Sequence, residues 1–253
     1  MAVSLQRAGM WKRISAFLFD AILLGILAVL FAFLLSSALG YDRYVDTLNR
    51  CYEAYGEQYG VDFQTSLSQY DSMTDEEKQQ LEEAYRAVGQ DEEAAYAYQM
   101  TIRLTILMVS LGILLACLIW EVLIPALLKD GQTLGKKIFS LGVMRSDGVR
   151  LGGVQLFVRS ILGKYTVEIM IPVLVAMMLY FGSTGLPGTL LILGLALVNG
   201  CLFLFTYAHT PIHDLLAGTV VVDLPSQRIF PTREDMIAFK ERMAAEKAAE
   251  KTF

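Results

Sequence analysis

Four carboxylic acids lie inside or beside long apolar stretches of this 253-residue chain, where an unpaired charge is unfavourable. Asp20, Glu121 and Glu168 interrupt such stretches, and Asp214 closely follows the last one. Ionisable residues at these positions are rare and indicate a functional site by default. A buried carboxylate can trade a proton for a small hard cation such as sodium. We therefore predict a cation or proton site without a bound cofactor, with Na⁺ or H⁺ as the transported ion.

Basic side chains accompany these acids at a similar depth. At a rise of about 1.5 Å per helical residue, Asp20 lies about 10 Å from Arg13, which marks the edge of its apolar run. Two interpretations stay open: an exchange site, or a static knot of salt bridges that orients the helices. In the second, Arg13 would pair with Asp214, and Arg159 with Asp20 or Glu121.

Membrane-spanning helices must position these charges. The chain is 55% hydrophobic with a mean hydropathy of +0.46, and a bilayer span needs about 20 apolar residues. We predict an all-α membrane protein with four transmembrane helices, multi-pass in the cell membrane. The predicted segments are a tail with the first span (1–40), an insertion (41–101), the second span (102–128), a basic connector (129–164), the third span (165–182), the fourth span (186–207), a His-Asp motif with a strand (208–224) and a helical tail (225–253).

The distribution of charge predicts the orientation. Residues 1–13 hold three basic side chains and no acidic one, and residues 129–164 hold seven basic against two acidic. The insertion 41–101 holds fourteen acidic and four basic side chains. Because Lys and Arg gather in short cytoplasmic loops, we expect both termini and the connector to be cytoplasmic and the insertion to be extracytoplasmic.

The acidic insertion is rich in tyrosine and has a helical pattern. Thr74 and Glu77 form a capping-box signature, and the apolar positions after it fall on one helical face: Leu81, Ala84, Tyr85 and Val88. Its tyrosines suit a helical cap that lies at the membrane interface. A lid that binds a partner is the alternative interpretation.

The connector and the segment after the fourth span contain β-prone runs. Two runs in "FSLGVMRSDGVRLG" flank a turn at Ser146–Gly148, and "GTVVVDL" at 218–224 is a third. We expect a small cytoplasmic β-hairpin or a sheet of three strands. Such a sheet would tie the end of the fourth span to the connector.

Three motifs resemble those of the RDD family of membrane proteins. They are "KRISAFLFD" with Arg13 and Asp20, "TLGK" with Thr133, Gly135 and Lys136, and "HDLLAG" with His213 and Asp214. The resemblance extends to a basic residue, Arg159, before the third span. Glu168 and the long acidic insertion are not part of that pattern. Some members of the family are described as sodium/proton antiporters, so the resemblance implies ion exchange.

The prediction for function therefore has two forms. In the first, Arg13, Asp20 and Asp214 form the polar centre of a cation/proton site together with Glu121 and Glu168. In the second, the protein transports nothing and is an accessory or scaffold that grips a partner through its insertion or its sheet. We expect contacts with the bilayer and with anionic lipids at the cytoplasmic basic residues, and either a homo-oligomer or another membrane protein as partner, but no nucleic acid.

Other classes of protein are disfavoured. No nucleophile–base pair lies at one depth, and "DGQTLGKK" lacks P-loop spacing, so we predict no enzyme activity. Two histidines and three scattered cysteines do not form a zinc-ligand pattern.

Overall fold

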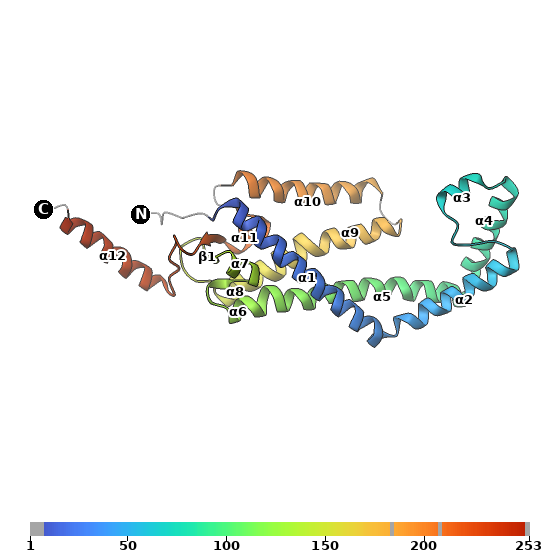
Figure 1. Ribbon diagram of the computed structural model, residues 1–253, viewed down its shortest axis with the longest axis horizontal. Coiled ribbons are helices and arrows are strands. Elements are labelled where there is room, and N and C mark those ends of the chain that lie inside the picture. The colour runs from blue at the N-terminus through green and yellow to red at the C-terminus, as the bar shows by residue number, and fades with distance from the viewer. Residues whose placement is uncertain (1–7, 183–184, 207–208, 251–253) are drawn as a thin grey trace. The chain divides into compact units, whose positions relative to one another are not determined.

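The computed structural model describes residues 8–182, 185–206 and 209–250. The described residues fall into two compact units, the first from 1–29 with 113–253 and the second from 30–112. Four helical stretches among them are long and apolar enough to cross a membrane: Met10–Leu39, Glu92–Leu127, Gly153–Tyr180 and Leu186–Phe205 (Figure 1). The chain is therefore a multi-pass membrane protein. These four candidate spans correspond to the four predicted ones, although the second begins at Glu92 and not at 102, and the third at Gly153 and not at Tyr165.

The spans expose apolar side chains around most of their circumference. The first is α1 (Met10–Leu39) and the fourth is α10 (Leu186–Phe205). Phe33 and Leu197 are 70% and 67% exposed, respectively. A helix that is apolar on all sides is suited to lipid. The few buried residues of α1 include Arg13, Ala16 and Asp20, which share one face near its start.

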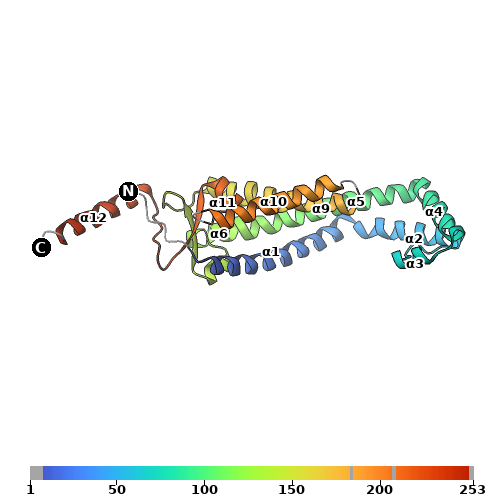
Figure 2. The ribbon, with the colours of Figure 1, turned by 90° about the horizontal axis from the view of Figure 1, so that it is seen from above.

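The second and third spans each contain π-helical turns. The second joins α5 (Glu92–Cys117), η1 (Leu118–Leu123) and α6 (Ile124–Leu127), and the third joins α8 (Gly153–Phe157), η3 (Val158–Met170) and α9 (Ile171–Tyr180). Here η1 and η3 are π-helical: the amides of Ile124 and Ile171 bond carbonyls five residues back, on Ile119 and Thr166. Such turns are rare and often mark functional sites. Helix α9 packs beside α10 (Figure 2).

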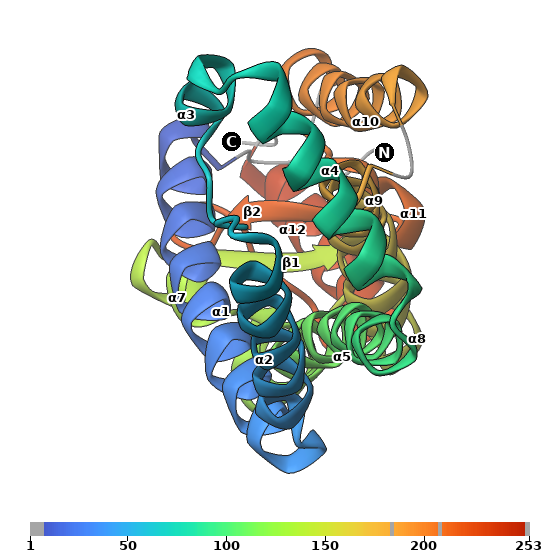
Figure 3. The same cartoon turned by 90° about the vertical axis from the view of Figure 1, so that its right-hand side faces the viewer.

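A small sheet closes one end of the first unit. Strands β1 (Leu141–Arg145) and β2 (Thr219–Asp223) pair antiparallel, with Val143 opposite Val221 (Figure 3). The expectation of a third strand is wrong for the described residues, because the run after the Ser146–Gly148 turn makes only isolated bridges, from Arg150 to Met144 and from Val149 to Phe230.

Short helices link this sheet to the spans. Segment η2 (Lys129–Gly131) and helix α7 (Leu134–Ile138) precede β1, and α11 (Ile212–Ala217) precedes β2. Ala16 of α1 packs on Leu141, Val143 and Val221, so the sheet anchors the start of the first span. Helix α12 (Arg233–Glu250) follows, and Thr232 caps it by accepting the amide of Asp235 at 3.1 Å.

The second unit contains the insertion. Helices α2 (Tyr41–Tyr59) and α4 (Asp75–Gln90) pack together, with α3 (Leu67–Ser72) between them in sequence. The predicted capping box of Thr74 and Glu77 is confirmed. Of the four positions predicted to share one apolar face, Leu81, Ala84 and Val88 are buried, whereas Tyr85 is 47% exposed and stacks edge-on against Phe63.

Candidate functional site

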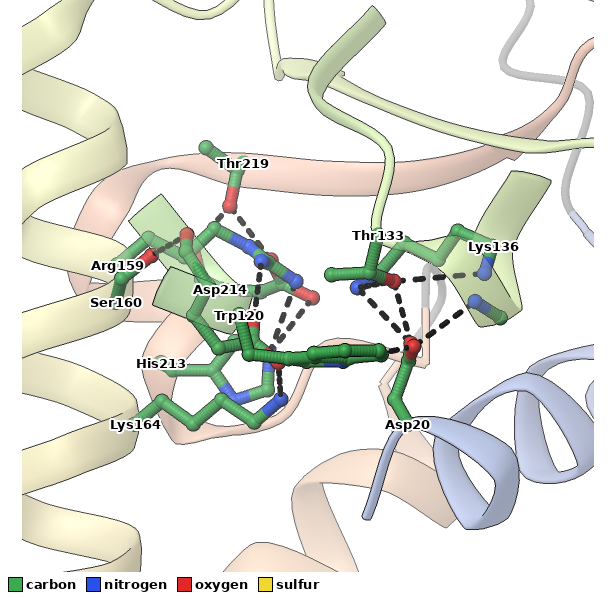
Figure 4. A network of polar contacts seen from close by, with 12 residues as sticks. Asp20, Trp120, Thr133, Lys136, Arg159, Ser160, Lys164, His213, Asp214 and Thr219 are labelled. Atoms are coloured by element: carbon green, nitrogen blue, oxygen red, sulfur yellow. Dashed lines mark hydrogen bonds and ion pairs between the residues drawn. The ribbon is translucent and has the colours of Figure 1, made fainter. Parts of the chain in front are cut away.

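Asp20 sits in a closed shell of hydrogen-bond donors, although it belongs to an apolar helix. Its Oδ1 accepts from the Trp120 indole at 3.1 Å and from the Gly135 amide at 2.9 Å. Its Oδ2 accepts from the Thr133 hydroxyl. The residue is 2% exposed, and these bonds offset the loss of water that burial imposes (Figure 4).

Gly135 allows α7 to approach this closely. A Cβ at that position would lie 2.5 Å from the Ala16 carbonyl oxygen and 2.9 Å from the Asp20 carboxyl carbon. Thr133 caps α7 by accepting the Lys136 amide at 3.4 Å. The "TLGK" stretch therefore lets the connector bind the first span through a hydroxyl and a backbone amide.

Lys136 completes the Asp20 half of the site. Its ammonium donates to the Thr133 hydroxyl at 3.1 Å and lies 3.9 Å from Asp20 Oδ2. The pKa of Lys136 is lowered to about 8, mainly by burial; Glu121 and Asp20 act in the opposite direction, whereas Arg159 and Lys164 also lower it. Lys136 can therefore lose its proton within about a unit of neutral pH, unlike an exposed lysine.

Arg159 is the centre of the other half. Its Nε donates to Asp214 Oδ1 at 2.7 Å, and Thr219 donates to the same oxygen at 2.6 Å. Burial alone would raise the pKa of Asp214, but the charge of Arg159 and these hydrogen bonds hold it well below its usual range. Asp214 is therefore a fixed anion that joins η3, α11 and β2.

The geometry also determines the protonation of His213. The Arg159 guanidinium, which can only donate, lies 3.2 Å from His213 Nε2, so Nε2 accepts. The proton is then on Nδ1, which lies 2.8 Å from Glu168 Oε2 and donates to it. Glu168 also accepts the His213 amide at 3.0 Å. His213 is neutral in this arrangement, and Glu168 holds α11 against η3.

Glu121 links the two π-helical segments. Lys164 donates to its Oε1, Arg159 lies 3.9 Å from its Oε2, and Ser160 donates to its backbone carbonyl at 2.7 Å. Glu121 has no exposed surface. The π-helical turns thus bring Glu121 of one span against Arg159, Ser160 and Lys164 of the next, and Lys164 donates to the carboxylate.

The sequence model of the RDD family matches residues 7–218 of this chain. The chain belongs to the RDD family. Neither a curated protein nor a solved structure matches it. The matched range includes the three motifs that resemble the family in the sequence.

The structure brings the sequence-derived candidates of this RDD protein into one cluster. Its members are Arg13, Asp20, Glu121, Thr133, Gly135, Lys136, Arg159, Glu168, His213 and Asp214. Arg13 lies 3.9 Å from Asp214, as the salt-bridge interpretation expects. Arg159 approaches Glu121 but binds Asp214 more closely, and it makes no ion pair with Asp20 among the described contacts.

Sequence reasoning missed three donors, one of which is Ser160 at the Glu121 carbonyl. Trp120 lies between the Asp20 half and the Arg159 half of the cluster (Figure 4), and Thr219 bonds Asp214 from the first position of β2. Trp120 directly precedes Glu121, and this position next to a predicted site residue could have identified it from the sequence. No sequence signal indicated Thr219, because only the pairing of β2 with β1 fixes the direction of its side chain.

A cavity of about 450 Å³ adjoins the cluster in this RDD protein. Asp20, Lys136, Arg159 and Asp214 line its polar side, and Phe17 and Phe203 are among the residues of its apolar side. The volume is within the ordinary range for small-molecule sites. The ion pairs are thus buried from bulk water but lie at the wall of a space that a ligand can enter.

Proposed function

We propose that this RDD-family protein exchanges a proton for a small monovalent cation, with Asp20 as the cation-binding carboxylate and Lys136 as the proton carrier. The supporting observation is the buried chain from Lys136 through Thr133 to Asp20, which lies at the wall of the cavity. The two charges are 3.9 Å apart and joined through a hydroxyl, so either can change partner without a large movement.

The exchange follows from charge balance. While Lys136 is protonated, its ammonium neutralises Asp20. When Lys136 releases its proton, Asp20 is left as a buried anion, and a sodium or potassium ion entering the cavity restores neutrality. One cation binds for each proton released. The other carboxylates are poorer candidates, because Arg159 keeps its charge at all ordinary pH values and holds Asp214.

Two further parts of the proposal concern the assembly. In the orientation that the charge distribution predicts, the cluster faces the cytoplasmic leaflet. Four spans offer little protein on which to build alternating access, so we propose that the transporting unit is a homo-oligomer.

Ion flux in proteoliposomes tests the proposal. We expect sodium- or potassium-driven proton movement with wild-type protein, rising between pH 7 and 9 as Lys136 deprotonates. Asp20→Asn and Lys136→Gln should both abolish it. Lys12→Gln is the matched control, since Lys12 is half exposed and pairs with Asp223 away from the cavity. Flux that persists in Asp20→Asn would contradict the proposal and favour a static knot.

The compact second unit supports the accessory role as a second candidate. An insertion with its own helix packing and capped helices is more elaborate than a connector requires. Deleting residues 45–95 separates the two functions. Unchanged flux with loss of a cross-linked partner would favour the accessory role, whereas loss of flux alone would count against it.

A further inference from the structure

The cavity beside the ion cluster has an amphipathic wall. Its apolar side comes from α1 and α10 and includes Phe17, Leu18, Ala196 and Phe203. Phe17 and Leu18 are more than half exposed, so the same surface continues onto the outside of the span, where lipid lies. The opposite wall carries charged side chains. A ligand that fills this space needs an apolar part and a strongly polar part.

The charges of the cluster balance. The described members are four cations and four anions: Arg13, Lys136, Arg159 and Lys164 against Asp20, Glu121, Glu168 and Asp214. His213 is neutral because it accepts from Arg159. A ligand with a net charge would therefore add an uncompensated charge in a medium of low dielectric. A zwitterionic ligand adds none and can pair with both signs.

One atom of the wall lacks a donor. Asp214 Oδ2 is buried and receives no hydrogen bond in the described structure. His213 Nε2 lies 3.6 Å away, but it is already an acceptor and cannot donate. The Arg13 guanidinium is 3.9 Å away, beyond hydrogen-bond distance. A buried carboxylate oxygen of this kind requires a donor, and Asp214 is one of the residues that line the cavity.

We propose that this cavity binds the headgroup of a phospholipid that carries a primary ammonium, as phosphatidylethanolamine does. The ammonium donates to Asp214 Oδ2, the phosphate lies at Arg13, and the first part of an acyl chain lies along Phe17 and Phe203. Basic pockets between transmembrane helices are established lipid-headgroup sites. The adjacent acid makes this pocket selective for a zwitterion. The proposal is independent of ion exchange, since it concerns binding without a gradient.

Thermal unfolding in detergent tests the proposal with four probes. These are phosphatidylethanolamine, phosphatidylcholine and phosphatidylglycerol with the same acyl chains, and free phosphoethanolamine. A ligand that binds only the folded state raises the Tm. We expect phosphatidylethanolamine to raise it at concentrations at least ten times lower than the other lipids, because a trimethylated ammonium cannot donate and phosphatidylglycerol brings a net charge. Equal effects of the three lipids would overturn the proposal, and an equal effect of phosphoethanolamine would show that the lipid is not the ligand.

A pair of variants on α10 locates the effect. Ala196→Phe places a ring in the cavity, whereas Val198 is exposed on the same helix and outside the cavity lining. We expect Ala196→Phe to lose the Tm shift and Val198→Phe to keep it. A retained shift in Ala196→Phe would overturn the location.

A second measurement needs no change in the cavity. Trp120 bonds Asp20, a residue of the cavity wall. In a Trp11→Phe background, phosphatidylethanolamine brominated near the headgroup should quench Trp120 fluorescence more strongly than brominated phosphatidylcholine. Equal quenching by the two lipids would count against the site.

Discussion

At the scale of single residues, the cluster separates side chains that can change charge from those that cannot. Arg159 and Asp214 form a buried pair joined by a direct hydrogen bond, and Arg159 holds the pKa of Asp214 well below its usual range. Lys136 shares the same buried region, but its ammonium is bonded to a neutral hydroxyl and lies 3.9 Å from its counter-ion. The opposite charge therefore offsets less of the effect of burial on the pKa of Lys136, and this lysine is the residue that we expect to release a proton.

The lowered pKa of Lys136 predicts a pH-dependent stability. In the unfolded chain the pKa of this lysine returns to about 10.5, whereas in the folded protein it is about 8. Between these values the unfolded state binds more protons, so the free energy of unfolding rises with pH, by at most about 3 kcal/mol. We expect the Tm in detergent to rise between pH 8 and 10 by more in wild type than in Lys136→Met.

Lys12→Met is the control for that measurement, because it removes a half-exposed lysine of the same unit. It should keep the wild-type dependence on pH. An identical dependence in wild type and Lys136→Met would show that the lysine is not held in a low-pKa environment.

At the scale of elements, two close approaches hold the site together. Connector helix α7 reaches α1 at Gly135, and α11 reaches η3 at Gly163, where an added Cβ would lie 2.6 Å from the His213 Cα. The second contact presses the His213–Asp214 turn onto the π-helical segment that carries Arg159. The ion pairs therefore depend on glycines that make no ion pair themselves.

Gly163→Ala should separate α11 from η3. A methyl group has no room there, so the helices must shift, at a cost of about 1–3 kcal/mol in the free energy of unfolding. Gly194→Ala is the matched control, since a Cβ there meets nothing within 4 Å and lies in helix α10. We expect a lower Tm in detergent for Gly163→Ala and an unchanged or slightly higher one for Gly194→Ala. Equal values would show that the α11 contact is not tight.

At the scale of the whole molecule, the charged segments between the spans determine the orientation of the chain in the membrane. Apolar helices of this kind fit the bilayer equally well in both directions, and only the unequal distribution of Lys and Arg distinguishes the sides. The segment between the second and third spans is basic, and the insertion between the first and second is acidic. The prediction that the site faces the cytoplasmic side of the membrane rests on this asymmetry.

Cysteine labelling in intact cells checks the orientation. The native cysteines Cys51, Cys117 and Cys201 are first replaced by serine. In that background, we expect a membrane-impermeant maleimide to label Gln79→Cys in intact cells and Ser146→Cys only after permeabilisation. The reverse pattern would place the insertion in the cytoplasm and invert the proposed direction of exchange.

The sequence by itself determined the membrane class, the four spans and the acids that belong together. Long apolar runs report burial in lipid without reference to a partner, and a charge within such a run needs compensation wherever it lies. Asp20, Arg159 and Asp214 could therefore be chosen as members of one cluster. The capping box at Thr74 was also readable, because its two partners are three residues apart.

Only the tertiary structure decided which charges pair. Arg159 binds Asp214 more closely than Glu121 because π-helical winding and the close contact at Gly163 set the rotation of η3, and an α-helical pattern contains no sign of either. The Trp120 and Thr219 donors, the neutral state of His213 and the amphipathic cavity likewise depend on contacts between residues far apart in the chain. Such contacts stabilise the site, and no local periodicity of the sequence predicts them.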